Sequence, residues 1–290
     1  TNLAIGGLNL REAIGRLHRL ETRPDLLLVY SGHNEFFRDL EDAERTAESP
    51  FRILDPLLMN SPTFVLTYRL LSHRAAVQEL KKDLAKNINQ SGSTLIRAHI
   101  VPVSIYQERL VRFRRHLEQL GAYCRREKIA TIWFVPAGNE ADWDPNRSSP
   151  LTIQSADVEE QLRIQYRNAT RFEAVGSYKA AMPIYERALK KHPELAEFHF
   201  RLGQCLLKLG RDDEAAHHLQ QALDTDGHPI RANADYRMII ADVARESEVP
   251  LIDGPSLLRR HTSRGILDST LFHDNVHPTL KTLFLLSLIH

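Results

Sequence analysis

Residues 176–189, Gly-Ser-Tyr-Lys-Ala-Ala-Met-Pro-Ile-Tyr-Glu-Arg-Ala-Leu, recur 34 residues later as residues 210–223, Gly-Arg-Asp-Asp-Glu-Ala-Ala-His-His-Leu-Gln-Gln-Ala-Leu. Small residues and large apolar residues occupy matching places in both: Gly176 with Gly210, Ala181 with Ala215, Tyr185 with Leu219, Ala188 with Ala222, and Leu189 with Leu223. Small residues let paired helices approach closely, and large ones fill the groove between neighbouring units. The pattern therefore predicts a block of paired helices between about residues 146 and 232.

The period and the small and large positions resemble tetratricopeptide repeats. Pro193 ends the first unit, and Gly227 occupies the corresponding place in the second. The resemblance implies a surface for a protein partner. Repeat arrays usually need about three units for independent stability, so we expect these helices to lean on the rest of the chain.

Apolar runs on both sides of the repeats predict an α/β arrangement. Short continuous apolar runs are typical of buried parallel strands; the predicted strands are residues 24–30, 129–135 and 249–253. Apolar positions at three- and four-residue spacing predict helices over residues 8–23, 105–127 and 234–247. Helix breakers within residues 50–100 predict an irregular, inserted helical flap near the site.

Two polar motifs stand near the ends of the chain. Ser31-Gly32-His33-Asn34-Glu35-Phe36 follows the first predicted strand, and open α/β sheets place their ligands at the carboxyl ends of strands. Asp274-Asn275-Val276-His277-Pro278 sets a carboxylate three residues before an imidazole. This spacing lets Asp274 hold the His277 ring in one tautomer and stabilise its protonated form. A helix-capping Asn and a surface turn with a histidine are the structural alternatives.

Together the motifs resemble the SGNH, or GDSL-type, family of serine esterases and lipases. The Gly-x-Asn-Glu block of that family matches residues 32–35, and its Asp-x-x-His-Pro block matches residues 274–278. Its block of an Asn followed five residues later by Gly matches Asn2 and Gly7.

The resemblance implies roles for seven residues. His277 and Asp274 are the implied catalytic residues. The Gly7 N–H and the Asn34 side-chain amide are the implied oxyanion hole, which stabilises the charge of a tetrahedral intermediate. The implied substrate contacts are Gly32, His33 and Glu35.

The resemblance also implies a three-layer, flavodoxin-like α/β sheet. The predicted domains are the two parts of a hydrolase core, residues 1–145 and 233–290, and a tetratricopeptide-like insertion, residues 146–232. The family's Gly-Asp-Ser block has no counterpart here, so we expect the first strand and the nucleophilic serine upstream of Thr1, and no activity in the chain as it stands. Ser31 and Ser256 are weaker candidates, since neither follows a strand in a tight glycine-containing turn.

The implied activity is hydrolysis of an ester by acyl transfer to serine, without a cofactor. The implied substrate carries an acetyl or other short acyl group on a carbohydrate or lipid. The alternative belongs to another class: an interaction scaffold whose repeats hold a partner protein and whose hydrolase fold is inactive. A third possibility combines the two roles: a hydrolase whose repeats recruit it to a polysaccharide-assembly or envelope complex.

The composition of the chain argues against several classes of protein and of binding site. With 42% hydrophobic and 26% charged residues, the 290-residue chain can bury a substantial core. Its formal net charge of +1 gives no reason to expect a nucleic acid partner. The two cysteines, Cys124 and Cys205, indicate neither a disulfide framework nor a zinc cluster. His273 adjoins Asp274, but no further carboxylate and histidine spacing completes a metal site, so we expect no metal.

Overall fold

The computed structural model describes residues 9–35, 103–145, 156–227 and 229–287. The chain divides into two compact units, Thr1–Phe36 with Leu95–His290, and Phe37–Thr94. The second unit and the flap predicted at residues 50–100 lie outside the described residues. The elements described below belong to the first unit. The predicted domain boundaries stay a prediction.

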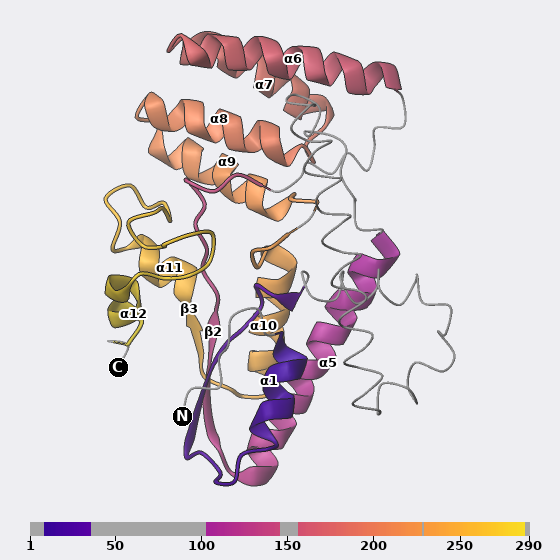
Figure 1. The fold of residues 1–290 in the computed structure, drawn as a ribbon, viewed down its shortest axis with the longest axis vertical. Coiled ribbons are helices and arrows are strands. Elements are labelled where there is room, and N and C mark those ends of the chain that lie inside the picture. The colour runs from indigo at the N-terminus through magenta and orange to yellow at the C-terminus, as the bar shows by residue number, and fades with distance from the viewer. Residues whose placement is uncertain (1–8, 36–102, 146–155, 228, 288–290) are drawn as a thin grey trace, which may run out of the picture. The chain divides into compact units, whose positions relative to one another are not determined.

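Within the described residues, three parallel strands form one sheet in the order β1-β2-β3 (Figure 1). The strands are β1 (Leu26–Tyr30), β2 (Ala130–Val135) and β3 (Leu251–Asp253). Each strand falls within one of the three predicted apolar runs, so the predicted strands are confirmed. Trp133, opposite Leu251 in the register, is fully buried at the centre of the sheet.

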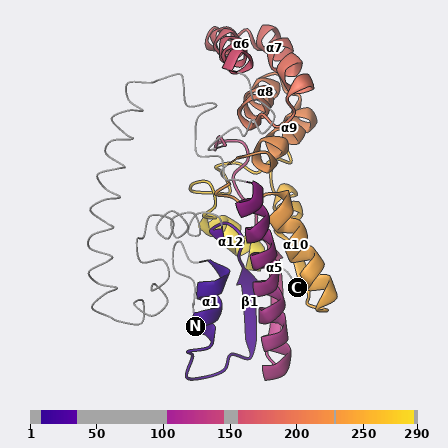
Figure 2. The same cartoon turned by 90° about the vertical axis from the view of Figure 1, so that its right-hand side faces the viewer.

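Helices lie on both sides of this sheet: α1 (Leu10–Leu17), α5 (Val103–Glu127) and α10 (Ala234–Glu246) on one, and α11 (Gly254–Arg259) and α12 (Leu280–Ser287) on the other (Figures 1 and 2). A capping box starts α1, in which Asn9 accepts a hydrogen bond from the Glu12 N–H at 2.9 Å and the Glu12 carboxylate accepts one from the Asn9 N–H at 3.2 Å. Phe113 of α5 and Tyr236 of α10 pack edge to face, with ring centroids 5.0 Å apart. The predicted helices are confirmed, although α1 is shorter than predicted.

Four helices follow the loop after β2 and form two pairs (Figure 1). The pairs are α6 (Ala156–Ala174) with α7 (Tyr178–Lys191), and α8 (Ala196–Lys208) with α9 (Asp212–Asp224). Gly176 and Gly210 stand in the turns within the pairs with φ of +74° and +71°. This left-handed conformation favours glycine, which explains why glycine recurs at this place in the repeat. The predicted helical repeat is confirmed.

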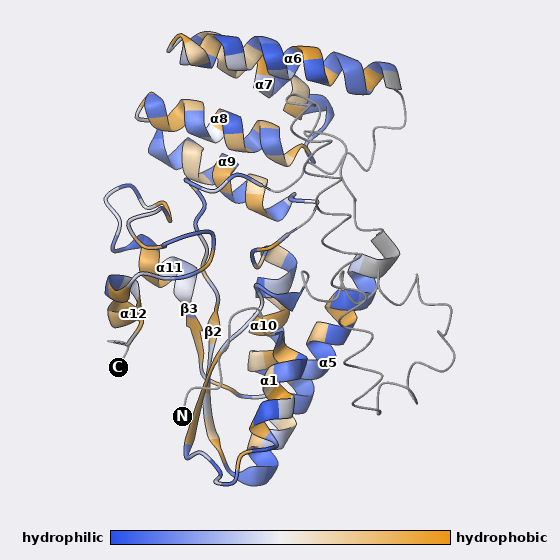
Figure 3. Ribbon diagram, in the orientation of Figure 1, coloured by the Kyte–Doolittle hydropathy of each residue, from blue (hydrophilic) through white to orange (hydrophobic). Residues whose placement is uncertain are grey.

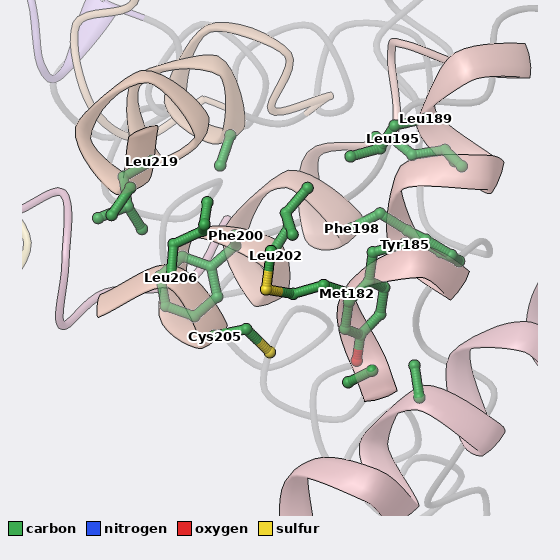
Figure 4. Packing of buried hydrophobic residues seen from close by; sticks show 14 of the residues in the cluster. Met182, Tyr185, Leu189, Leu195, Phe198, Phe200, Leu202, Cys205, Leu206 and Leu219 are labelled. Carbon is green, nitrogen blue, oxygen red and sulfur yellow. The ribbon is translucent and has the colours of Figure 1, made fainter. Parts of the chain in front are cut away.

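The repeat core contains the small and large positions that the sequence predicted. Ala181, Ala215 and Tyr185 are fully buried. The Tyr185 ring meets the Phe198 ring nearly at right angles, with centroids 5.7 Å apart, and joins α7 to α8 (Figure 4). The core is therefore continuous across both helix pairs, as repeat stacking requires.

Gly203 lies at a close approach of α8 to α9. A Cβ atom placed on Gly203 would lie 2.8 Å from Leu219 Cγ. We expect Gly203→Ala to lower the free energy of unfolding by about 1–2 kcal/mol, because overpacking outweighs the better helix propensity of alanine. Urea unfolding measures this change. In a Leu219→Ala background, the added cost of Gly203→Ala should disappear, and an equal cost in both backgrounds would contradict the steric explanation.

The repeats also contact the rest of the unit. Gln204 of α8 donates a hydrogen bond to the Ala141 carbonyl at 2.5 Å. Arg259 of α11 donates to Gln220 of α9 at 3.1 Å, and the Arg264 guanidinium forms an ion pair with Asp212 at 2.5 Å. These contacts confirm the expectation that the helices lean on the rest of the chain.

The predicted three-layer, flavodoxin-like architecture with its first strand missing is wrong. The described residues are mostly helical, with strands of five, six and three residues. A doubly wound sheet buries both faces of its strands, yet Leu26 and Leu28 of β1 are 51% and 59% exposed. The apolar composition of β1 therefore did not predict its burial, because this strand lies at an edge of the sheet. Among the helices that the structure describes, none is long and apolar enough to cross a membrane.

Candidate functional site

The Asp274–His277 pair forms as the sequence predicted. His277 Nδ1 lies 2.6 Å from Asp274 Oδ2, while Asp274 Oδ1 accepts hydrogen bonds from the N–H groups of His277 and Val276 at 2.7 and 2.9 Å. Partial burial raises the pKa of Asp274, but these hydrogen bonds outweigh it and hold that pKa below its ordinary value. The His277 side chain is exposed. Local spacing thus gives an oriented imidazole at the surface.

Two loops bring this pair to the carboxyl end of β2. The Asn139 N–H donates to the Asn275 carbonyl at 2.9 Å. A Cβ atom on Gly138 would lie 3.0 Å from the same oxygen. The close approach of the two backbones therefore favours a residue without a side chain at Gly138.

Two predicted residues of the first motif, His33 and Glu35, are buried and hydrogen-bonded within the protein. His33 is buried, its Nδ1 accepts the Ala232 N–H at 3.0 Å, and burial lowers its pKa to about 3. Glu35 is buried and accepts hydrogen bonds from the Leu10 N–H at 2.7 Å and the Ser31 hydroxyl at 3.0 Å. Both side chains thus tie the loop after β1 to its surroundings.

The other residues of this predicted site are Gly32, Asn34 and Gly7. Gly32 is buried with φ of +132°, which favours glycine. Asn34 is half-buried, and Gly7 lies outside the described residues. Both motifs lie beside the loop after β2: the Tyr30 hydroxyl, directly before the first motif, donates to the Ala137 carbonyl at 3.0 Å, and the Asn139 N–H donates to the Asn275 carbonyl of the second motif at 2.9 Å. The catalytic, oxyanion and substrate roles implied for the seven residues stay a prediction.

A second site, which the sequence did not predict, is a pocket between the repeats and the loop after β2. We call it the repeat pocket. Its cavity volume is about 520 Å³. It is lined by the loop residues Ala141, Asp142 and Asp144, by Thr170, Glu173 and Ala174 of α6, by Tyr178 of α7, and by Phe200, Arg201, Gln204 and Lys208 of α8.

An ion pair forms one wall of the repeat pocket. Arg201 Nη2 and Nε bind the two carboxylate oxygens of Glu173 at 2.5 and 3.2 Å, and the Tyr185 hydroxyl also donates to Glu173. Two parallel hydrogen bonds fix a guanidinium in the plane of the carboxylate. This geometry holds the C-terminal end of α6 at a set separation from the middle of α8.

The opposite wall is the loop after β2. The buried Arg231 guanidinium donates to the Asn139 and Trp143 carbonyls at 2.6 and 2.8 Å. Asp142 accepts the Ser269 N–H at 2.7 Å. The loop is therefore fixed before any ligand binds, which lowers the entropic cost of binding.

The repeat pocket was missed because its walls come from distant segments. The available signal was Arg201, which lies three residues after the buried Phe198 and so on the core-facing side of α8. A charged residue at such a place needs a partner. The sequence does not say that this partner is Glu173.

Two histidines meet between α8 and α9: His199, which is buried, and His218, which is half-buried. His199 Nδ1 is 2.9 Å from His218 Nδ1, and His199 Nε2 is 3.0 Å from the Pro193 carbonyl. Since that carbonyl accepts, neutral His199 carries its proton on Nε2 and accepts from His218. Burial first, and then the charges of His218 and His217, lower the pKa of His199 to about 4.

This pair predicts a loss of stability in mild acid. Well above pH 6.5, the ordinary pKa of histidine, His199 is neutral in both the folded and the unfolded state, and its contribution is complete. As the pH falls towards 4, the unfolded chain binds the proton first, so the folded state loses stability. We expect the His199 contribution to fall by about 2 kcal/mol between pH 7 and pH 5. Urea unfolding of the wild type and of His199→Gln at both values measures it. His261→Gln, at an exposed histidine, should keep the wild-type pH dependence, and an unchanged dependence in His199→Gln would contradict the assignment.

No group of three or more His, Cys, Asp or Glu within the described ranges could hold a metal ion. Residues 174–242 match the tetratricopeptide repeat family. No curated protein and no solved structure matches the chain.

These comparisons correct the prediction of a serine hydrolase. The family they detect is the tetratricopeptide repeat, which supports protein–protein interaction. The SGNH or GDSL resemblance, and with it an esterase acting on a carbohydrate or lipid ester, has no support in them and is wrong as the main interpretation. The interaction scaffold, which was the alternative, fits the comparisons better. The resemblance of residues 176–223 to tetratricopeptide repeats is confirmed.

Proposed function

We propose that this protein is an interaction module in which the repeat pocket holds a short segment of a partner protein. The observation that carries the proposal is the pocket between two helix pairs and a fixed loop. Its volume of about 520 Å³ lies within the roughly 300–1,000 Å³ typical of ligand sites. A peptide entering it would contact the C-terminal end of α6, the C-terminal half of α8 and the loop after β2.

The lining favours a polar peptide over an apolar ligand. Tyr178 and Phe200 supply aromatic surface, which binds at a low cost in side-chain entropy. Lys208 and the carboxylates of Asp142 and Asp144 supply both signs of charge. A peptide segment carries hydrogen-bond donors, acceptors and charged side chains that can pair with such a lining.

Selection of peptides from a displayed random library tests the proposal. We expect peptides selected on the full chain to bind it measurably in fluorescence anisotropy. Ala174→Trp places a large side chain in the pocket at an exposed position and should weaken binding at least about tenfold. Ala180→Trp makes the same change at an exposed position of α7 outside the lining and should leave the dissociation constant unchanged.

Two outcomes would overturn the proposal. One is that no peptide is enriched on the folded chain. The other is that the selected peptides bind Ala174→Trp as tightly as the wild type, which would place their site elsewhere. Far-UV circular dichroism of both variants establishes that the helices are intact.

A further inference from the structure

The outer face of α6 departs from the way repeat arrays normally end. In Figures 1 and 2, α6 is the outermost helix of the stack. Terminal repeats require a polar outer face for solubility, and most of α6 is indeed hydrophilic (Figure 3). Yet Ile164 and Phe172 of α6, and Val175 directly after it, are 44%, 41% and 74% exposed. Apolar side chains therefore stand where a further repeat would stack.

The charges along this face are arranged symmetrically about Ile164. Asp157 precedes Ile164 by seven residues, and Arg171 follows it by seven. Seven residues make almost two helical turns, so the three side chains lie along one stripe of α6. Asp157 and Arg171 are both exposed, and the structure shows no ion pair for either within the described chain. One end of the stripe is thus acidic and the other basic.

We infer that α6 packs against α6 of a second copy of this chain, antiparallel, with Ile164 at the two-fold axis. In this arrangement Asp157 of each copy faces Arg171 of the other, and the two Ile164 side chains meet at the centre. A two-fold interface uses the same patch on both copies and must be self-complementary. The stripe meets that requirement, because reversing its direction exchanges its acidic and basic ends.

Repeat stability gives a second reason for this occupant. Each copy contributes two helix pairs, which is fewer than the roughly three units that repeat arrays usually need. Pairing through α6 would join four helix pairs into one stack and cover Ile164. The repeat pocket is lined by other residues of α6, Thr170, Glu173 and Ala174, so the dimer leaves the proposed peptide site open.

Sedimentation velocity of the full chain over a range of concentrations tests the inference. We expect a reversible dimer. Ile164→Asp, which places like charges at the axis, should weaken it at least about tenfold. Asp157→Arg and Arg171→Asp should each weaken it similarly, because each single variant sets two like-charge pairs across the interface.

Mixing the two charge variants gives the sharpest result. In a mixed dimer of Asp157→Arg with Arg171→Asp, both cross-interface pairs are again of opposite sign. We expect native mass spectrometry of the mixture to show mainly the heterodimer. Arg187→Asp makes the same change at an exposed position of α7. This control variant should dimerise as tightly as the wild type.

Three outcomes would overturn the inference. The first is a wild-type chain that stays monomeric up to about 100 μM, the weak end of specific association. The second is a dimer unaffected by Ile164→Asp. The third is a mixture that shows no preference for the heterodimer, which would contradict the pairing of Asp157 with Arg171 across the two-fold axis.

Discussion

Arg259→Ala is expected to lower the free energy of unfolding by about 3–5 kcal/mol, the cost of leaving a buried charge without its partner. The Glu140 side chain is 3% exposed, and its two oxygens accept hydrogen bonds from the Arg259 guanidinium at 2.6 and 2.7 Å. Burial already raises the pKa of Glu140 against the influence of Arg259. Without the guanidinium, this carboxyl must bind a proton or draw in water. Urea unfolding monitored by circular dichroism measures the change.

A second substitution separates the buried charge from the lost packing of Arg259. Glu140→Gln in the Arg259→Ala background removes the unpaired carboxylate, so the double variant should be more stable than Arg259→Ala alone. Arg260→Ala, at the exposed neighbouring position, serves as the control and should change stability by less than about 0.5 kcal/mol. If Arg259→Ala costs no more than this control, the ion pair is not a determinant of stability.

Phe198→Ala is expected to lower the free energy of unfolding by about 3–5 kcal/mol, because it removes a large buried ring and leaves a cavity. Phe198 is 1% exposed, and its ring centroid lies 5.7 Å from those of both Tyr166 and Tyr185. It therefore joins α6, α7 and α8. The cavity should loosen the helix pairs more than the sheet, since each repeat is stabilised mainly by its neighbours.

Hydrogen exchange of the Phe198→Ala variant locates the loss. We expect faster exchange in α6 to α8 than in β2. Phe284→Ala makes the same substitution at a position that is 63% exposed and should change both stability and exchange little. A uniform increase in exchange across α6 to α8 and β2 would show instead that the unit unfolds as one cooperative body.

The repeat could be predicted from the sequence because its constraints are local and recur. Gly176 and Gly210 each meet the same backbone requirement at the turn within a pair, and Ala181 and Ala215 each allow a close helix contact. The sheet shows the opposite case. The strand at residues 26–30 was predicted correctly, but its burial was not, since composition does not say whether a layer covers Leu26 and Leu28.

The two candidate sites also differ in how far the sequence predicts them. The contact of Asp274 with His277 follows from three residues of spacing, so it could be expected before the structure. The ion pair of Arg201 with Glu173, and the loop opposite it, join segments far apart in the chain. Their meeting depends on how α6 stacks on α8, which no spacing in the sequence encodes.

The two tryptophans of the chain stand in different surroundings and give it two optical reporters. Trp133 is fully buried in β2, whereas Trp143 is 37% exposed in the loop between the two aspartates of the repeat pocket. Emission from Trp133 should shift to longer wavelength only when the sheet opens to water. Emission from Trp143 should respond to a bound peptide and to an added quencher while the fold stays intact. A Trp143→Phe variant would then isolate the unfolding signal, and a Trp133→Phe variant the binding signal, without an attached dye.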